Sequence, residues 1–179
     1  MSFFPTLPRH AAVLAVTLHA AACAHSQGRP ATPPISIAVT NIGFGPDNGL
    51  TAEEQAECEL GTELFEELHD EVDNAFALHS VAGYRGVPGL VLVMRFARVE
   101  GQDFASGTKS IVLEGKLLRD GQVTADFVAM RYTSNGAFGN YNRGFKSSCG
   151  ILEDVVEELA EDVGEWLREP TMNAQLGDL

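Results

Sequence analysis

Two strongly amphipathic segments, residues 51–72 and 147–170, flank a middle section that is patterned for β-strands. Both segments repeat apolar residues at helical spacing, with acidic residues between them. The apolar positions are Cys58, Gly61, Leu64, Phe65, Leu68 and Val72 in the first segment, and Leu152, Val155, Val156, Leu159, Val163, Trp166 and Leu167 in the second. Because an apolar stripe must be buried against another layer of structure, the chain is limited to folds in which two helices cover a common layer.

Local signals mark the helix ends and the strands. Thr51 and Glu54 match the capping box that starts a helix, and Pro170 ends the second helix. Strand patterns occupy residues 35–44, 74–83, 89–101 and 109–135, and Asp120-Gly121 predicts a tight hairpin within the last of these. The predicted fold class is α+β: a largely antiparallel sheet with two long amphipathic helices packed on one face, in the order β-α-β-β-β-β-α.

The N-terminus has the organisation of a secretory signal. Arg9 precedes an apolar run shorter than the roughly 20 residues that span a membrane, and small residues follow. The sequence AAAC at residues 20–23 resembles the lipobox of bacterial lipoproteins. This resemblance implies lipidation of Cys23, for example with palmitate, and an outer-membrane lipoprotein that faces the periplasm. The alternative is an ordinary cleaved signal peptide and a soluble periplasmic or secreted protein.

These segments predict a simple domain organisation. Residues 1–22 form the lipoprotein signal peptide, and residues 23–34 form the lipidated cysteine with a flexible, proline-rich tether. Residues 35–170 have the length of a single α+β domain. Residues 171–179 are predicted to be a C-terminal tail.

The net charge of −13 over 179 residues excludes some classes of partner. Nucleic-acid binding requires a basic surface, and anionic lipid headgroups likewise attract basic residues. We therefore predict no nucleic-acid partner. Contact with the membrane is expected through the N-terminal lipid rather than through a protein surface.

The three cysteines, Cys23, Cys58 and Cys149, suggest a disulfide. If Cys23 is lipidated, the other two remain and could pair in the oxidising periplasm. Each lies at the N-terminal edge of an apolar stripe, so parallel helices would bring them within the Cα separation of about 4.4–6.8 Å that a disulfide requires. The alternative is two buried thiols that behave as small apolar residues.

The sequence contains no recognisable catalytic, cofactor-binding or metal-binding motif. The G-x-S-x-G, P-loop, H-E-x-x-H and CxxC patterns are absent, and no cofactor and no metal are predicted. We expect His69 to lie on the surface and His79 to be half-buried. Glu53, Glu57 and Glu63 are better explained as a solvated helix face than as a calcium site.

Cys149 supports a less favoured enzymatic hypothesis. A thiol at a helix N-terminus is stabilised as the thiolate, and cell-wall cysteine peptidases use such a placement. In those enzymes a histidine base follows the cysteine along the chain, whereas no histidine follows Cys149. The sequence therefore predicts no catalytic residue.

The loop from residue 134 to residue 145 is the candidate interaction site. It combines glycine and asparagine with Phe138, Tyr141, Arg143 and Phe145, a composition that suits adaptable protein contacts. The alternative is a strand-to-helix connection whose aromatic side chains pack on the core.

The order of elements resembles that of small proteobacterial envelope lipoproteins of unknown function, including those with a DUF4410 domain. It also resembles the α+β domains of the N-terminal part of TolB and of lipoprotein activators of penicillin-binding proteins. The resemblance is carried by a first strand, a long helix, the segment VLVMRFARVEG, a hairpin around RDG and a closing helix. It implies a non-catalytic, periplasm-facing lipoprotein that binds another envelope protein or assembles an envelope complex. The alternative is a small-molecule or lipid carrier with a cavity between sheet and helices.

Overall fold

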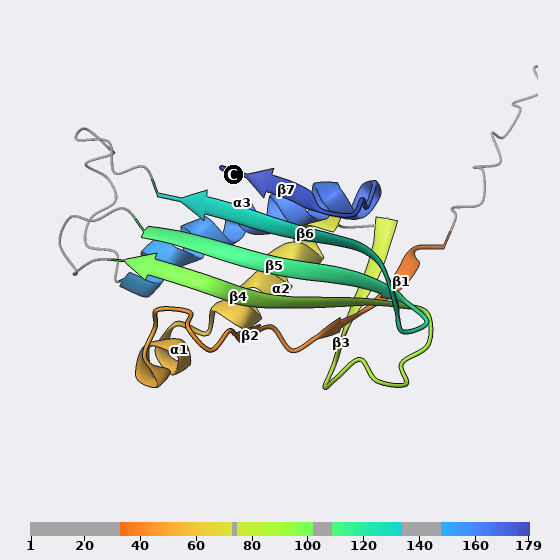
Figure 1. The fold of residues 1–179 in the computed structure, drawn as a ribbon, viewed down its shortest axis with the longest axis horizontal. Coiled ribbons are helices and arrows are strands. Elements are labelled where there is room, and N and C mark those ends of the chain that lie inside the picture. Colours follow the sequence, from red (N-terminus) through yellow and green to blue (C-terminus); the bar gives the residue numbers. More distant parts are fainter. Residues whose placement is uncertain (1–32, 73–74, 102–108, 134–147) are drawn as a thin grey trace, which may run out of the picture. The chain divides into compact units, whose positions relative to one another are not determined.

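The computed structural model describes residues 33–72, 75–101, 109–133 and 148–179 (Figure 1). Their seven strands form one sheet in the order β3-β1-β4-β5-β6-β7, with the short β2 beside β4. The strands are β1 (Ile35–Thr40), β2 (Gly43–Phe44), β3 (Phe76–Val81), β4 (Leu90–Gly101), β5 (Lys109–Arg119), β6 (Gln122–Tyr132) and β7 (Ala174–Gly177). The helices are α1 (Ala52–Cys58), α2 (Leu60–Val72) and α3 (Ser148–Arg168). The predicted α+β class is confirmed.

The sheet is mixed rather than largely antiparallel. Strands β4, β5 and β6 are antiparallel, as the sequence predicts. However, β1 runs parallel to β3 and β4, and β6 runs parallel to β7. The physical reason is the position of the helices, since a helix that connects two neighbouring strands returns the chain so that both run in the same direction.

The first predicted helix is divided in two. Helix α1 ends at Cys58, and Glu59 adopts a left-handed conformation with φ of 44° before α2 begins at Leu60. The division brings Leu60 into the core together with Leu64, both fully buried. No glycine or asparagine marks this position, so the sequence carries no local signal for the break.

Helices α2 and α3 run parallel on the same side of the sheet. Their starting ends are joined at Cys58 and Cys149, and at the other end Arg168 of α3 lies 3.1 Å from the carboxylate of Glu71 of α2. In Figure 1 both helices lie behind β4, β5 and β6. The face of these strands toward the viewer is therefore the one turned away from the helices.

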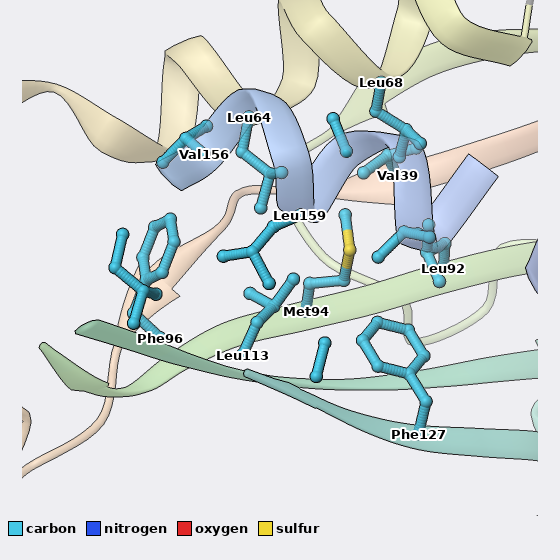
Figure 2. Packing of buried hydrophobic residues seen from close by; sticks show 14 of the residues in the cluster. Val39, Leu64, Leu68, Leu92, Met94, Phe96, Leu113, Phe127, Val156 and Leu159 are labelled. Carbon is cyan, nitrogen blue, oxygen red and sulfur yellow. The ribbon is translucent and has the colours of Figure 1, made fainter. Parts of the chain in front are cut away.

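A single apolar core fills the space between helices and sheet (Figure 2). The helices contribute side chains such as Leu64 and Leu159, which meet Met94 and Leu113 of the central strands. These four side chains are buried to 98% or more. Burial of this apolar area drives the two layers together.

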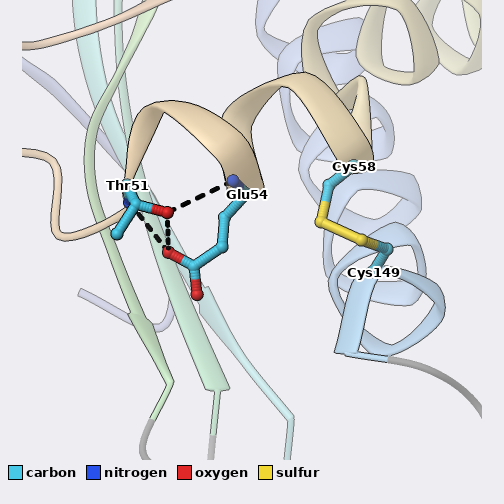
Figure 3. The surroundings of a disulfide bond; sticks show 4 residues. All are labelled: Thr51, Glu54, Cys58 and Cys149. Carbon is cyan, nitrogen blue, oxygen red and sulfur yellow. Dashed lines mark hydrogen bonds between the residues drawn. A yellow bond between two sulfur atoms is a disulfide. The ribbon is translucent and has the colours of Figure 1, made fainter.

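The predicted capping box at the start of α1 is present (Figure 3). The amide of Glu54 donates to the hydroxyl of Thr51 at 3.3 Å, and the amide of Thr51 donates to the carboxylate of Glu54 at 2.8 Å. The hydrogen bonds from Thr51, the backbone one foremost, hold the pKa of Glu54 below its usual value. The carboxylate is thus stabilised in its ionised form.

The predicted hairpin also forms. Asp120 and Gly121 both have positive φ, 52° and 81°, as a two-residue turn of type I′ requires. The carboxylate of Asp120 accepts the amide of Gly89 at 2.9 Å, which fixes the turn against the start of β4.

The segment 171–179 is not the tail that the sequence suggests, because it contains β7. The amide of Asp178 donates to the carbonyl of Met130, and Arg131 of β6 forms two hydrogen bonds with Asp162 of α3. Those bonds raise the pKa of Arg131, and Asp178 lies 3.6 Å from the same guanidinium. This segment has only nine residues and shows little periodicity. Its pairing with β6 therefore cannot be predicted from the segment alone.

None of the helices within the described residues has the length and apolar character needed to cross a membrane.

Candidate functional site: the open face of the sheet

Strand alternation places two sets of side chains on opposite faces of β4, β5 and β6. On β6, Phe127 and Ala129 point into the core, so Val128, Met130 and Tyr132 point away from the helices. Among the described residues, no helix packs on this outer side. We call one part of this outer surface the open sheet face; it is formed by Arg95, Arg98, Glu100, Val112, Glu114, Lys116, Asp126, Val128, Met130 and Tyr132.

Apolar side chains gather at one end of the open sheet face. Val112 of β5 lies directly opposite Met130 of β6, and both are half-buried. Beside them Val128 is 38% exposed and Tyr132 is 45% exposed. An aromatic residue among aliphatic ones, accessible on a sheet surface, is typical of the centre of a protein interface.

Charged pairs surround this apolar group. The guanidinium of Arg95 donates to the carboxylate of Glu114 on the neighbouring strand at 2.7 and 2.9 Å, and Arg98 lies 3.4 Å from Glu100. Lys116 and Asp126 are direct cross-strand neighbours, as are many oppositely charged residues in sheets. An apolar centre with a polar rim of both signs is suited to binding another protein surface.

At its other end the outer side of the sheet is covered by the chain itself. Ala38, Val91 and Leu118 form a small buried cluster there, and Val87 of the connection between β3 and β4 packs against it. The apolar group around Val128 lacks such a cover among the described residues.

The predicted disulfide between Cys58 and Cys149 is present, with a Cα–Cα separation of 4.9 Å (Figure 3). It joins the end of α1 to the start of α3 across 91 residues of sequence. In this state Cys149 has no free thiol, which removes the nucleophile that the enzymatic hypothesis requires.

The histidines and carboxylates that the sequence brought into consideration lie apart from the open sheet face. His69 is exposed, and its ring lies 3.6 Å from Asp70. His79 is also exposed rather than half-buried, because β3 is an edge strand and this residue points away from the helices. The described residues contain no group of three side chains placed to hold a metal ion, and Glu53, Glu57 and Glu63 stand on α1 and α2 without converging.

An open groove of about 530 Å³ lies where β1 and β3 end beside the junction of α1 and α2. Thr40, Ser80, Glu59 and Phe65 are among its lining residues. This groove lies at the perimeter, whereas the space between sheet and helices, in which a carrier would hold its cargo, is filled by core side chains. The packing therefore gives the carrier alternative little support.

Two sequence-based predictions fall outside the described residues. These are Cys23 with its signal and tether, and the candidate interaction loop with Phe138, Tyr141, Arg143 and Phe145. Both remain predictions.

Sequence reasoning missed the open sheet face, although a signal for it exists. In the segment DFVAMRY both alternating sets of β6 are largely apolar, Phe127 and Ala129 on one side and Val128, Met130 and Tyr132 on the other. A strand with one solvated face normally alternates with polar residues. Apolar residues in both sets therefore distinguish β6 from an ordinary strand with one solvated face.

The chain is similar to known proteins in its structure. Neither a protein-family model nor a curated protein matches the chain, so the resemblance to DUF4410 domains is not confirmed. Several solved structures are similar. A DUF330 protein from Xanthomonas campestris is 17% identical, with a TM-score of 0.47, and the match covers 78% of this chain and 88% of that one.

Two further structures are of bacterial proteins. A homologue of a neuraminyllactose-binding hemagglutinin from Helicobacter pylori is 13% identical, with a TM-score of 0.47 and coverage of 77% and 86%. A minor lipoprotein from Acinetobacter baumannii is 10% identical, with a TM-score of 0.41 and coverage of 82% and 100%. None of the three names describes an enzyme. The likeness concerns the fold and carries no ligand or partner to this chain.

Proposed function

We propose that this chain is a non-catalytic envelope lipoprotein that acts as a protein-binding or assembly module, and that it docks its partner on the open sheet face. The observation that carries the proposal is the accessible apolar group of Val112, Val128, Met130 and Tyr132 on a sheet surface without a covering helix among the described residues. Surfaces of this kind are uncommon on monomeric proteins unless they bind something.

The ion pairs around the apolar group add to this argument. Arg95 with Glu114, and Arg98 with Glu100, present both signs of charge at the rim. Such pairs contribute little to the stability of the fold, since each is exposed to solvent. They are well placed to select a partner whose charges are complementary.

Photo-crosslinking in cells tests this function. A benzophenone-bearing amino acid placed at Val128 or at Tyr132 should form covalent adducts with a protein partner. The matched control places it at Glu158, an exposed residue of α3 on the helical side. Adducts at Val128 and Tyr132 but not at Glu158 are expected. Equal yields at all three positions, or none at the sheet positions, would contradict docking on the open sheet face.

Lipidation of Cys23 is the second part of the proposal, and it rests on the lipobox-like sequence AAAC. The intact mass of the chain isolated from the membrane fraction should correspond to a chain that begins at acylated Cys23. Cys23→Ser should lose the added lipid mass and leave the membrane fraction. An unmodified chain of the same membrane distribution would show that the anchor is absent.

A further inference from the structure

The charges of the described chain are divided between its two layers. The acidic residues of α1, α2 and α3 are Glu53, Glu54, Glu57, Glu63, Glu66, Glu67, Asp70, Glu71, Glu153, Asp154, Glu157, Glu158, Glu161, Asp162 and Glu165. Against these, Arg168 is the one lysine or arginine that the three helices contain. The helical layer is therefore strongly acidic and repels any other acidic surface.

The strands, in contrast, carry more basic than acidic residues. Their basic residues are Arg95, Arg98, Lys109, Lys116, Arg119 and Arg131, and their acidic residues are Glu100, Glu114 and Asp126. On the open sheet face Arg95, Arg98 and Lys116 are matched in number by Glu100, Glu114 and Asp126, and the apolar group lies beside them. The open sheet face is thus a surface of this acidic protein on which a second acidic molecule meets no excess of negative charge.

Two copies of the chain could meet through this face in two ways. If the helical layer of one copy met the sheet of the other, carboxylates would be buried against Val128 and Tyr132, and removing carboxylates from water is costly. If both copies used the open sheet face, the apolar groups would meet, and the rim charges of each copy would find opposite charges on the other. The two acidic helical layers would then lie on the far sides of the pair.

We propose that the partner on the open sheet face is a second copy of this chain, in an isologous dimer whose two sheets pack face to face. This inference rests on the proposed function, because it names the partner of the same surface. Face-to-face packing of two sheets is a common arrangement, with the sheets about 10 Å apart.

The size of the face predicts a weak association. Even the full strands, of 11 or 12 residues rising about 3.3 Å per residue and about 4.8 Å apart, have a projected area of only roughly 500 Å² per copy, and the open sheet face is part of that area. Interfaces that bury less than about 1,200 Å² in total belong to weak or transient complexes. A lipid anchor would raise the effective concentration of copies on one membrane and so favour the dimer.

Sedimentation equilibrium of the full-length chain in density-matched non-ionic detergent tests the proposal. The ionic strength is raised from about 0.01 M to about 1 M, over which the Debye length falls from about 30 Å to about 3 Å. A sheet-to-sheet dimer should strengthen with salt, because screening weakens the repulsion between two acidic copies. Association held by attraction between the acidic helical layer of one copy and basic residues of the strands of the other would weaken with salt instead, and that result would overturn the proposal.

A pair of matched variants identifies the surface. Val128→Glu places a carboxylate in the apolar group and should weaken dimerisation at least tenfold. Val123→Glu adds the same charge to the same strand at its other end, where the side chain is 46% exposed, and should leave the dimer unchanged. Equal effects of the two variants would overturn the assignment to this surface.

The outcomes separate this inference from the proposed function. A chain that remains monomeric at all salt concentrations, yet forms adducts with a different protein from Val128 in cells, overturns the dimer and leaves protein docking on this face intact. Adducts at Val128 with twice the mass of the chain support the dimer directly. A monomer without any adduct at Val128 overturns both.

Discussion

Gly115 of β5 and Phe127 of β6 are direct cross-strand partners, and the ring of Phe127 occupies the space in which a side chain at position 115 would lie. The same ring packs edge-on against Trp166 of α3, with ring centroids 4.8 Å apart. The glycine therefore allows one aromatic residue to cover the inner face of the sheet and to contact the helical layer. Glycines on strands are often covered by an aromatic neighbour in this way.

We predict that Gly115→Ala destabilises the fold by about 1–3 kcal/mol, because the added methyl group collides with the Phe127 ring in a packed core. Urea unfolding followed by circular dichroism measures the change. Gly83→Ala is the matched control, since a Cβ at Gly83 has no atom within 4 Å. The same loss of stability in both variants would show that backbone effects, rather than this packing, are responsible.

Loss of the disulfide should destabilise the fold by about 2–4 kcal/mol. Cys58 and Cys149 are separated by 91 residues, so their bond removes much conformational freedom from the unfolded chain. The free energy of unfolding of the Cys58→Ser/Cys149→Ser double variant should match that of the reduced native chain. If the double variant and the reduced native chain both unfold with the same free energy as the oxidised native chain, the bond does not restrict the unfolded state.

Asp162→Asn should destabilise the fold by about 1.5–3 kcal/mol and loosen β7. The substitution removes the carboxylate that accepts two hydrogen bonds from the half-buried Arg131, and hydrogen bonds to charged groups are the stronger ones. Hydrogen exchange at Leu176 should become faster than in the native chain. Glu161→Gln, an exposed neighbour on α3, should change neither quantity. Unaltered exchange at Leu176 in Asp162→Asn would contradict the coupling.

The destabilising contribution of Glu67 on α2 should diminish as the pH falls. Burial, and then the nearby carboxylates of Glu157 and Glu63, raise the pKa of Glu67 in the folded chain. The folded chain therefore binds a proton at Glu67 more readily than the unfolded chain does. The ionised side chain thus destabilises the fold fully at neutral pH, and this destabilisation disappears below the ordinary pKa of glutamate.

Glu67→Gln should accordingly stabilise the protein at pH 7 by about 0.2–0.5 kcal/mol, the size of one like-charge pair on a helix. At acidic pH the native chain and the Glu67→Gln variant should be equally stable. Glu165→Gln, which makes the same change in net charge at an exposed position of α3, provides the control. A larger gain from Glu67→Gln at acidic pH than at pH 7 would contradict this account.

The sequence was informative where the determinants are local. The capping box needs only Thr51 and Glu54, and the hairpin needs only Asp120-Gly121, so both were predictable. Cysteine parity and the two apolar stripes favoured the pairing of Cys58 with Cys149 on the condition that the two helices run parallel, as they do in the structure. These features depend on periodicity and composition within single segments.

The sequence was uninformative where tertiary contacts decide the structure. The left-handed turn at Glu59 has no local marker, and its reason is the burial of Leu60 against the sheet. Strand β7 depends on Arg131 and Asp162, which lie far from it in the sequence. The open sheet face was predictable in principle from the apolar character of both alternating sets on β6, whereas which set faces the helices emerges only from the fold.

Hydroxyl-radical footprinting of the native protein in isolated membranes tests the central claim most directly. Tyr132 on the open sheet face is 45% exposed and Tyr84 in the connection between β3 and β4 is 42% exposed, so the two rings are matched probes. If another protein surface covers the open sheet face, Tyr132 should be protected from oxidation in membranes while Tyr84 is oxidised readily. Equal oxidation of Tyr132 and Tyr84 would contradict the claim that this face is a docking surface.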